Sequence, residues 1–97
     1  FRDYIHVDDC SRAIELILTK GKINEIYNVG NGLTVWLKDT IQYAKEELNS
    51  SSEVVSIPTK LFHTKVQTLH MVLNTSKITE LGYEPRYVGR DLIRQLI

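Results

Sequence analysis

The sequence has 97 residues, of which 42% are hydrophobic, and a chain of this length buries only about 60–70% of its unfolded surface. We therefore expect a thin core in one small domain or in part of a larger one. Twelve Lys and Arg balance twelve Asp and Glu, so the zero formal net charge argues against a general polyanion binder and against nucleic acid as a partner.

The cysteine content and the hydropathy pattern point to a reducing, cytoplasmic setting. The single cysteine, Cys10, has no partner for an internal disulfide. No stretch approaches the ~20 apolar residues of a membrane span, so no membrane partner is expected. The first residues do not resemble a secretory leader, and the chain opens directly on a strand-like run. We therefore expect it to be a piece of a longer cytoplasmic protein.

The first predicted unit is a strand that runs directly into a helix. Residues 3–7 alternate polar and β-favouring side chains, which is typical of a strand. Asp8 and Asp9 then offer an N-cap and first-turn negative charge to a helix over residues 8–20. For Asp9 this structural role is preferred to a functional one. Gly21 predicts a left-handed C-terminal end to that helix.

The second unit is a strand, a turn and an amphipathic helix. Residues 25–29 are β-favouring, residues 30–32 form a glycine-rich turn, and Thr34 is a candidate N-cap for a helix over residues 34–48. The apolar stripe of this helix consists of Leu37, Ile41, Ala44 and Leu48.

The last third of the sequence is less regular. Residues 53–57 and 71–73 predict short strands, and residues 58–67 predict a loop or lid with short helical turns. A helical turn is expected over residues 75–81 and a final amphipathic helix over residues 89–97. The piece as a whole is predicted to be mixed α+β, with about three or four helices and several short strands.

Three segments carry recognisable motifs. Residues 2–9 read Arg-Asp-Tyr-Ile-His-Val-Asp-Asp and are followed by Ala13, and residues 27–32 read Tyr-Asn-Val-Gly-Asn-Gly. Residues 73–85 combine Leu-Asn-Thr-Ser-Lys with Leu-Gly-Tyr-Glu-Pro. In this order and spacing they resemble signatures of the extended short-chain dehydrogenase/reductase family, specifically its NAD-dependent nucleotide-sugar epimerases and dehydratases.

The resemblance implies an α/β parent protein whose N-terminal Rossmann domain binds NAD or NADP. Residues 1–97 would be its C-terminal substrate-binding region, with a nucleotide sugar as substrate and that Rossmann domain as partner. The sequence contains no glycine-rich dinucleotide loop and no Tyr-x-x-x-Lys. We therefore assign no catalytic and no cofactor-binding residue here, and expect residues 1–97 alone to bind no cofactor.

The parent is expected to be an enzyme that oxidises a nucleotide sugar transiently and then epimerises, dehydrates or decarboxylates it. Two alternatives stay open. One is a non-catalytic binding or regulatory protein that retains the nucleotide-sugar fold, and the other is a free-standing small α/β adaptor. A homodimer is also left open, because the helix over residues 34–48 offers a face for a second subunit.

Arg2 is the first candidate for substrate binding. The resemblance implies that it grasps the substrate diphosphate, and a guanidinium fork matches two phosphate oxygens. The alternative is a surface salt bridge to Asp3 or Asp8.

Asn28 and Lys65 are the other two candidates. Asn28 and the turn at residues 30–32 either present backbone amides to a ligand or simply connect a strand to a helix. Lys65 lies where the resemblance implies a second basic residue for the diphosphate, although the Arg-Pro-Gly run typical of that region is missing.

Other chemically distinctive residues receive ordinary interpretations. His6, His63 and His70 have no partners at ligand spacing, so no metal site is assigned. Cys10 lies on an apolar helix face and is expected in the core. Trp36 either stacks on a base, anchors an interface, or is an ordinary half-buried aromatic.

Overall fold

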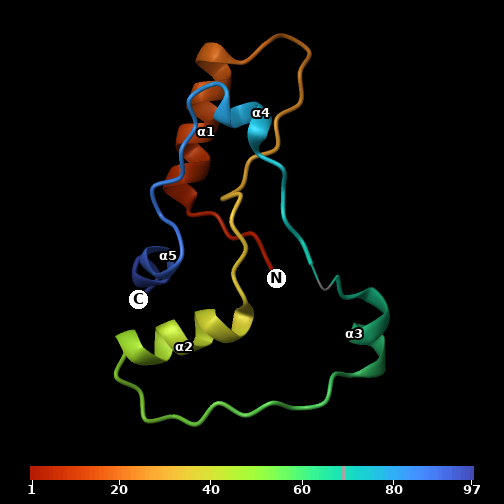
Figure 1. The fold of residues 1–97 in the computed structure, drawn as a ribbon, viewed down its shortest axis with the longest axis vertical. Coiled ribbons are helices and arrows are strands. Elements are labelled where there is room, and N and C mark those ends of the chain that lie inside the picture. The colour runs from red at the N-terminus through yellow and green to blue at the C-terminus, as the bar shows by residue number, and fades with distance from the viewer. Residues whose placement is uncertain (69) are drawn as a thin grey trace.

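The computed structural model describes residues 1–68 and 70–97, which form five helices joined by long open segments (Figure 1). The helices are α1 (Val7–Lys20), α2 (Leu37–Glu47), α3 (Leu61–Val66), α4 (Ser76–Thr79) and α5 (Arg90–Arg94). None of the helices in the described ranges is long and apolar enough to cross a membrane.

The prediction of several short strands is wrong for the described residues. The one β contact there is an isolated antiparallel bridge between Arg2 and Val35, with N–H···O distances of 3.2 and 3.0 Å. Residues 25–29, 53–57 and 71–73 run as open, non-helical chain. A strand needs a second backbone to complete its hydrogen-bond ladder, and the described chain supplies only a single such bond to these segments, from the Met71 amide to the Phe1 carbonyl at 3.2 Å. The number of helices is also higher than the three or four expected.

α1 agrees closely with the helix predicted over residues 8–20, but its ends differ from expectation. His6 is the N-cap, and its Nδ1 accepts a hydrogen bond from the Asp8 amide at 3.1 Å. Asp8 and Asp9 lie in the first turn, where their negative charge interacts favourably with the positive end of the helix dipole. Gly21 is extended (φ −66°, ψ 147°), not left-handed. Its amide donates to the Ile17 carbonyl, and a Cβ would lie 2.4 Å from that oxygen.

The other helices are shorter than their sequence patterns suggested. α2 begins three residues beyond Thr34, and its N-cap is Trp36, which makes no side-chain capping bond. α3 is a short helix inside the expected lid at residues 58–67. α4 and α5 cover only parts of the segments predicted at 75–81 and 89–97.

The core lies where α4 meets α1. Ala13 and Ile78 are fully buried and pack with Tyr83. The Tyr83 hydroxyl donates to the Gly30 carbonyl at 2.9 Å, so the core is tied to the turn that follows residues 25–29. Burial raises the pKa of Tyr83, and the nearby Asp9 charge raises it further.

A second contact joins α2 to α5. Glu47 accepts from Arg90 Nε at 2.9 Å and from Arg94 Nε at 3.0 Å, while Arg90 also pairs with Glu46 at 2.8 Å. The Arg90 guanidinium lies 5.5 Å from the centre of the Tyr43 ring. Leu92 and Ile93 of α5 are buried.

The molecule is thin and leaves much apolar surface uncovered. Its extents are 49 × 34 × 15 Å and its radius of gyration is 16.4 Å, whereas a compact chain of this length has roughly 12–13 Å. The accessible surface is 7672 Å², against roughly 5,700 Å² for a compact monomer of this mass. Leu37, Ile41 and Leu48 of the α2 stripe are 59%, 40% and 59% exposed. These apolar side chains are left uncovered by the rest of the described chain.

We expect the isolated polypeptide of residues 1–97 to be marginally stable or to self-associate, because its open shape leaves little apolar surface buried. Urea unfolding and analytical ultracentrifugation measure this. A monomer with a steep transition and well over ~5 kcal/mol of stability would instead identify an autonomous domain.

Candidate functional site

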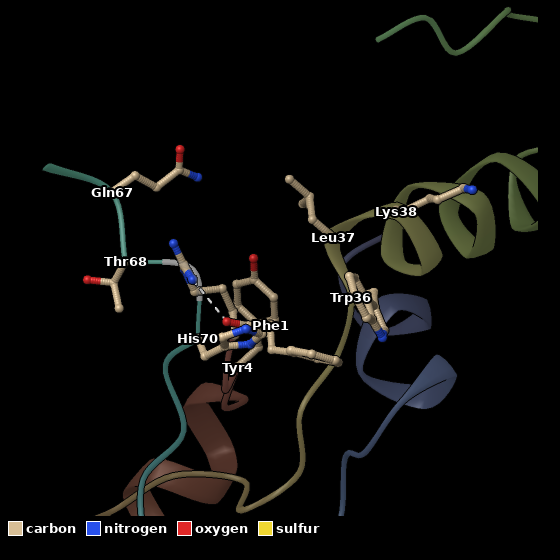
Figure 2. Close-up of a pocket in the computed structure, with 9 residues that line it drawn as sticks. Phe1, Tyr4, Trp36, Leu37, Lys38, Gln67, Thr68 and His70 are labelled. Atoms are coloured by element: carbon tan, nitrogen blue, oxygen red, sulfur yellow. Dashed lines mark hydrogen bonds between the residues drawn. The ribbon is translucent and has the colours of Figure 1, made fainter. Parts of the chain in front are cut away.

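A groove of about 480 Å³ lies beside the Arg2–Val35 bridge (Figure 2). The polypeptide brings the groove together from three segments: the first residues of the chain, the start of α2, and the segment that follows α3. The rings that line it are those of Phe1, Tyr4, Trp36 and His70. The groove therefore joins parts of the sequence that lie up to about seventy residues apart, and only the tertiary fold makes it.

Aromatic rings form much of the groove wall. The Phe1 and Trp36 ring centres are 4.0 Å apart with an interplanar angle of 54°, and Phe1 stacks on His70 at 5.0 Å. The Phe1–His70 distance is within the range of favourable ring pairs, and the Phe1–Trp36 rings are in still closer contact. Trp36 remains 54% exposed and Tyr4 38% exposed, so ring surface is left to contact a ligand.

Arg2 provides positive charge in this groove. Its Nη1 donates to the Phe1 carbonyl at 2.9 Å, which uses one of the five N–H donors of a guanidinium. In the part of the chain that the structure describes, no carboxylate forms an ion pair with Arg2. Asp3 and Asp8 are bonded elsewhere, so the alternative of a surface salt bridge does not form.

Asp3 holds the glycine-rich turn in place. Its carboxylate accepts the amides of Asn31 at 2.7 Å and Gly32 at 3.1 Å, and the Leu73 amide at 3.4 Å. The approach is close enough that a Cβ on Gly30 would lie 2.8 Å from the carboxylate. The amides of Asn31 and Gly32 are thus bonded to Asp3, which favours the interpretation of residues 30–32 as a structural turn.

Asn31 connects this turn to the groove. It is 6% exposed, and its side-chain amide donates to the carbonyls of Tyr4 at 3.1 Å and Tyr87 at 3.0 Å. The backbone of Tyr4, a groove residue, is therefore fixed by a side chain 27 positions away.

Asp9 makes the most extensive polar contacts of any buried residue described. It is fully buried and accepts the amides of Arg86 at 3.0 and 3.1 Å and Tyr87 at 3.0 Å, together with the Arg12 guanidinium. Burial raises the pKa of Asp9, but the Tyr87 and Arg86 amides and Arg12 outweigh it, so the pKa lies below its ordinary value of 3.8. Asp9 thus fastens α1 to the chain leading into α5.

The structure does not bring the three predicted substrate-binding residues together. Arg2 lines the groove, whereas Asn28 and Lys65 are not among its described lining residues. Asn28 Nδ2 donates to the Asn74 carbonyl at 3.3 Å, and Lys65 lies exposed on α3. Their binding roles stay predictions. Two polar residues that follow α3, Gln67 and Thr68, reach the groove instead.

Sequence reasoning missed the structural partners of the site. Asp3, Asn31 and Asp9 each bind backbone that lies 27 to 78 positions away. The only local signal was that all three fall inside the three sequence motifs.

Lys38 also lines the groove, although its side chain points away from the rings in Figure 2.

No group of three or more His, Cys, Asp or Glu residues in the described ranges could hold a metal ion. What remains at the groove is a guanidinium beside aromatic surface. That arrangement suits a ligand with an anionic group and a planar ring, because the guanidinium can bind the anionic group and the aromatic rings can contact the planar ring. The groove is therefore a candidate ligand-binding site on an open, partly uncovered surface.

Comparisons with known proteins show what the chain is similar to. Residues 1–30 match the model of the NAD dependent epimerase/dehydratase family. The chain is 30% identical over 93% of its length to dTDP-glucose 4,6-dehydratase of Streptomyces niveus, covering 26% of that protein. It is 28% identical over 97% of its length to putative GDP-L-fucose synthase 2 of Arabidopsis thaliana, covering 27%. It is 28% identical over 99% of its length to human dTDP-D-glucose 4,6-dehydratase, covering 28%. No solved structure matches.

The chain is thus similar to the NAD-dependent epimerase/dehydratase family in residues 1–30 and to named enzymes over nearly its whole length. It spans a little over a quarter of the length of these relatives. The relatives named here are, by their names, enzymes of nucleotide-sugar conversion.

Proposed function

We propose that residues 1–97 are the substrate-binding region of an NAD(P)-dependent nucleotide-sugar epimerase or dehydratase, and that Arg2 grips the substrate diphosphate. The observation that carries this proposal is the position of Arg2 in an aromatic groove without a carboxylate partner among the described residues. A guanidinium binds phosphate oxygens through two parallel N–H bonds. The neighbouring rings offer surface to the nucleoside.

The family depends in general on NAD or NADP, and the residues of this chain do not fit that cofactor. A dinucleotide pyrophosphate binds to free amides of a glycine-rich turn at a helix N-terminus. The glycine-rich turn at residues 30–32 has its Asn31 and Gly32 amides directed to Asp3. Cofactor binding and the catalytic Tyr-Lys pair therefore fall to a Rossmann domain in the same protein, which would also cover the exposed apolar faces.

Replacing Arg2 by alanine in the full-length protein should weaken binding of a nucleoside diphosphate about ten- to a hundredfold, while NAD affinity stays unchanged. Loss of a charge-assisted contact to phosphate costs roughly 1.5–3 kcal/mol. Arg2→Lys should recover only part of the affinity, because an ammonium lacks the planar fork. Calorimetric titration with each ligand measures these changes.

Arg86→Ala is the matched control, since Arg86 is exposed and does not line the groove. It should leave both affinities within about twofold. Equal losses of nucleoside diphosphate and NAD binding in Arg2→Ala would indicate a folding defect, and no loss of either would reduce Arg2 to a surface charge. Both results contradict the proposal.

A further inference from the structure

Trp36 has features that its place at the start of α2 does not explain. It occupies the N-cap position and makes no side-chain capping bond there, although Ser, Thr, Asp or Asn would stabilise the helix at that point. Its ring is 54% exposed despite its contact with Phe1. Local helix stability therefore does not account for a tryptophan at this position.

The Arg2–Val35 bridge fixes Trp36 relative to the guanidinium. Val35 precedes Trp36 directly, and its two backbone hydrogen bonds to Arg2 hold the two segments side by side. Arg2 and Trp36 consequently border the same groove. A nucleoside diphosphate carries its anionic group and its planar base on opposite sides of one ribose, so it can present each to one of these side chains.

We propose that Trp36 is the base-stacking residue of the groove and contributes to specificity for nucleoside diphosphates over simple diphosphates. The inference rests on the proposed function of Arg2 and adds the recognition of the base. Phe1 packs against the Trp36 ring and supports it from one side. Stacking on an indole tolerates any base, so the residue distinguishes ligands with a base from those without one.

The test is to measure binding of thymidine diphosphate, guanosine diphosphate and inorganic pyrophosphate to the full-length protein. Trp36→Leu should weaken the tighter-binding nucleoside diphosphate roughly tenfold or more and leave pyrophosphate within about twofold. Trp36→Phe, which keeps a ring, should stay within about threefold of wild type for all three ligands. Phe62→Leu is the control, because Phe62 is 69% exposed on α3 and does not line the groove.

Equal losses for pyrophosphate and nucleoside diphosphate in Trp36→Leu, or no loss for either, would overturn the assignment of Trp36. So would unchanged nucleotide affinity with a changed sedimentation coefficient, which would make Trp36 an interface anchor. Arg2→Ala, measured in parallel, should weaken all three ligands. If it weakens none, the proposed function itself fails, and this result is distinct from a failure at Trp36.

Discussion

Replacing Asp9 by alanine should lower the free energy of unfolding of the full-length protein by about 3–5 kcal/mol, as expected when one partner of a buried, hydrogen-bonded charge pair is removed. The Arg86 and Tyr87 amides would lose their acceptor, and the Arg12 guanidinium would lose its counter-charge. Chemical denaturation at neutral pH, followed by far-ultraviolet circular dichroism, measures the loss.

Asp8→Ala is the control for this experiment. Asp8 lies in the same helical turn, but its side chain is 64% exposed, so its removal should cost at most about 1 kcal/mol of helix-dipole interaction. Asp9→Asn should fall between the two, because it keeps one acceptor oxygen but places an N–H₂ group near N–H donors. A cost at Asp9 no larger than that at Asp8 would show that the carboxylate does not hold the C-terminal segment.

The contribution of Asp9 should also depend on pH in a defined direction. The pKa of Asp9 in the folded protein lies below its ordinary value of 3.8. The stability it provides is therefore complete above about pH 4 and is lost as the pH falls through the lower folded pKa. The difference in unfolding free energy between wild type and Asp9→Ala should be constant from pH 5 to 7 and shrink in stronger acid. A difference that grew on acidification would contradict this picture.

Replacing Asp3 by alanine should cost about 2–3 kcal/mol of stability in the full-length protein and weaken nucleoside diphosphate binding as well. The carboxylate holds the Asn31 and Gly32 amides, and the chain runs from that turn to Val35, whose bridge positions Arg2. Loss of the turn should therefore loosen the groove. Denaturation and calorimetric titration of the same variant give both quantities.

Asp3→Asn distinguishes the hydrogen bonds from simple packing. It preserves the volume of the side chain but offers one carbonyl acceptor where Asp3 offers two carboxylate oxygens. It should recover part of the stability and part of the nucleotide affinity together, because both depend on the same turn. Full stability with lost affinity would instead place Asp3 in direct contact with the ligand.

The helices followed from local sequence, although most of their ends did not. The apolar spacing of α1 predicted the helix to within a residue, since each α-helical hydrogen bond joins residues four apart. The apolar stripe of α2 was equally clear, yet the helix starts at Leu37. Val35 pairs with Arg2 in the β-bridge, so residues 34 and 35 are not helical. A competing long-range contact decided that boundary.

The strands could not be predicted in the same way. Residues 53–57 have a β-favouring composition, but a strand forms only when a second backbone pairs with it, and none lies beside them in the described chain. The same reasoning covers residues 25–29. The sequence pattern indicated the β preference of each segment, and the tertiary structure decided whether a second backbone lay beside it to pair with.

The sequence by itself determined the family motifs, the positions of the main helices and the choice of Arg2 as a ligand-binding candidate. Tertiary structure alone decided which residues stand beside Arg2, placing Trp36 and His70 at the groove and leaving Asn28 and Lys65 away from it. It also turned Asp9 from an expected helix cap into a buried clamp on Tyr87, 78 positions away. The physical reason is range, since helix formation depends on neighbours within four residues, whereas burial and hydrogen bonding of a side chain depend on whatever segment the fold brings beside it.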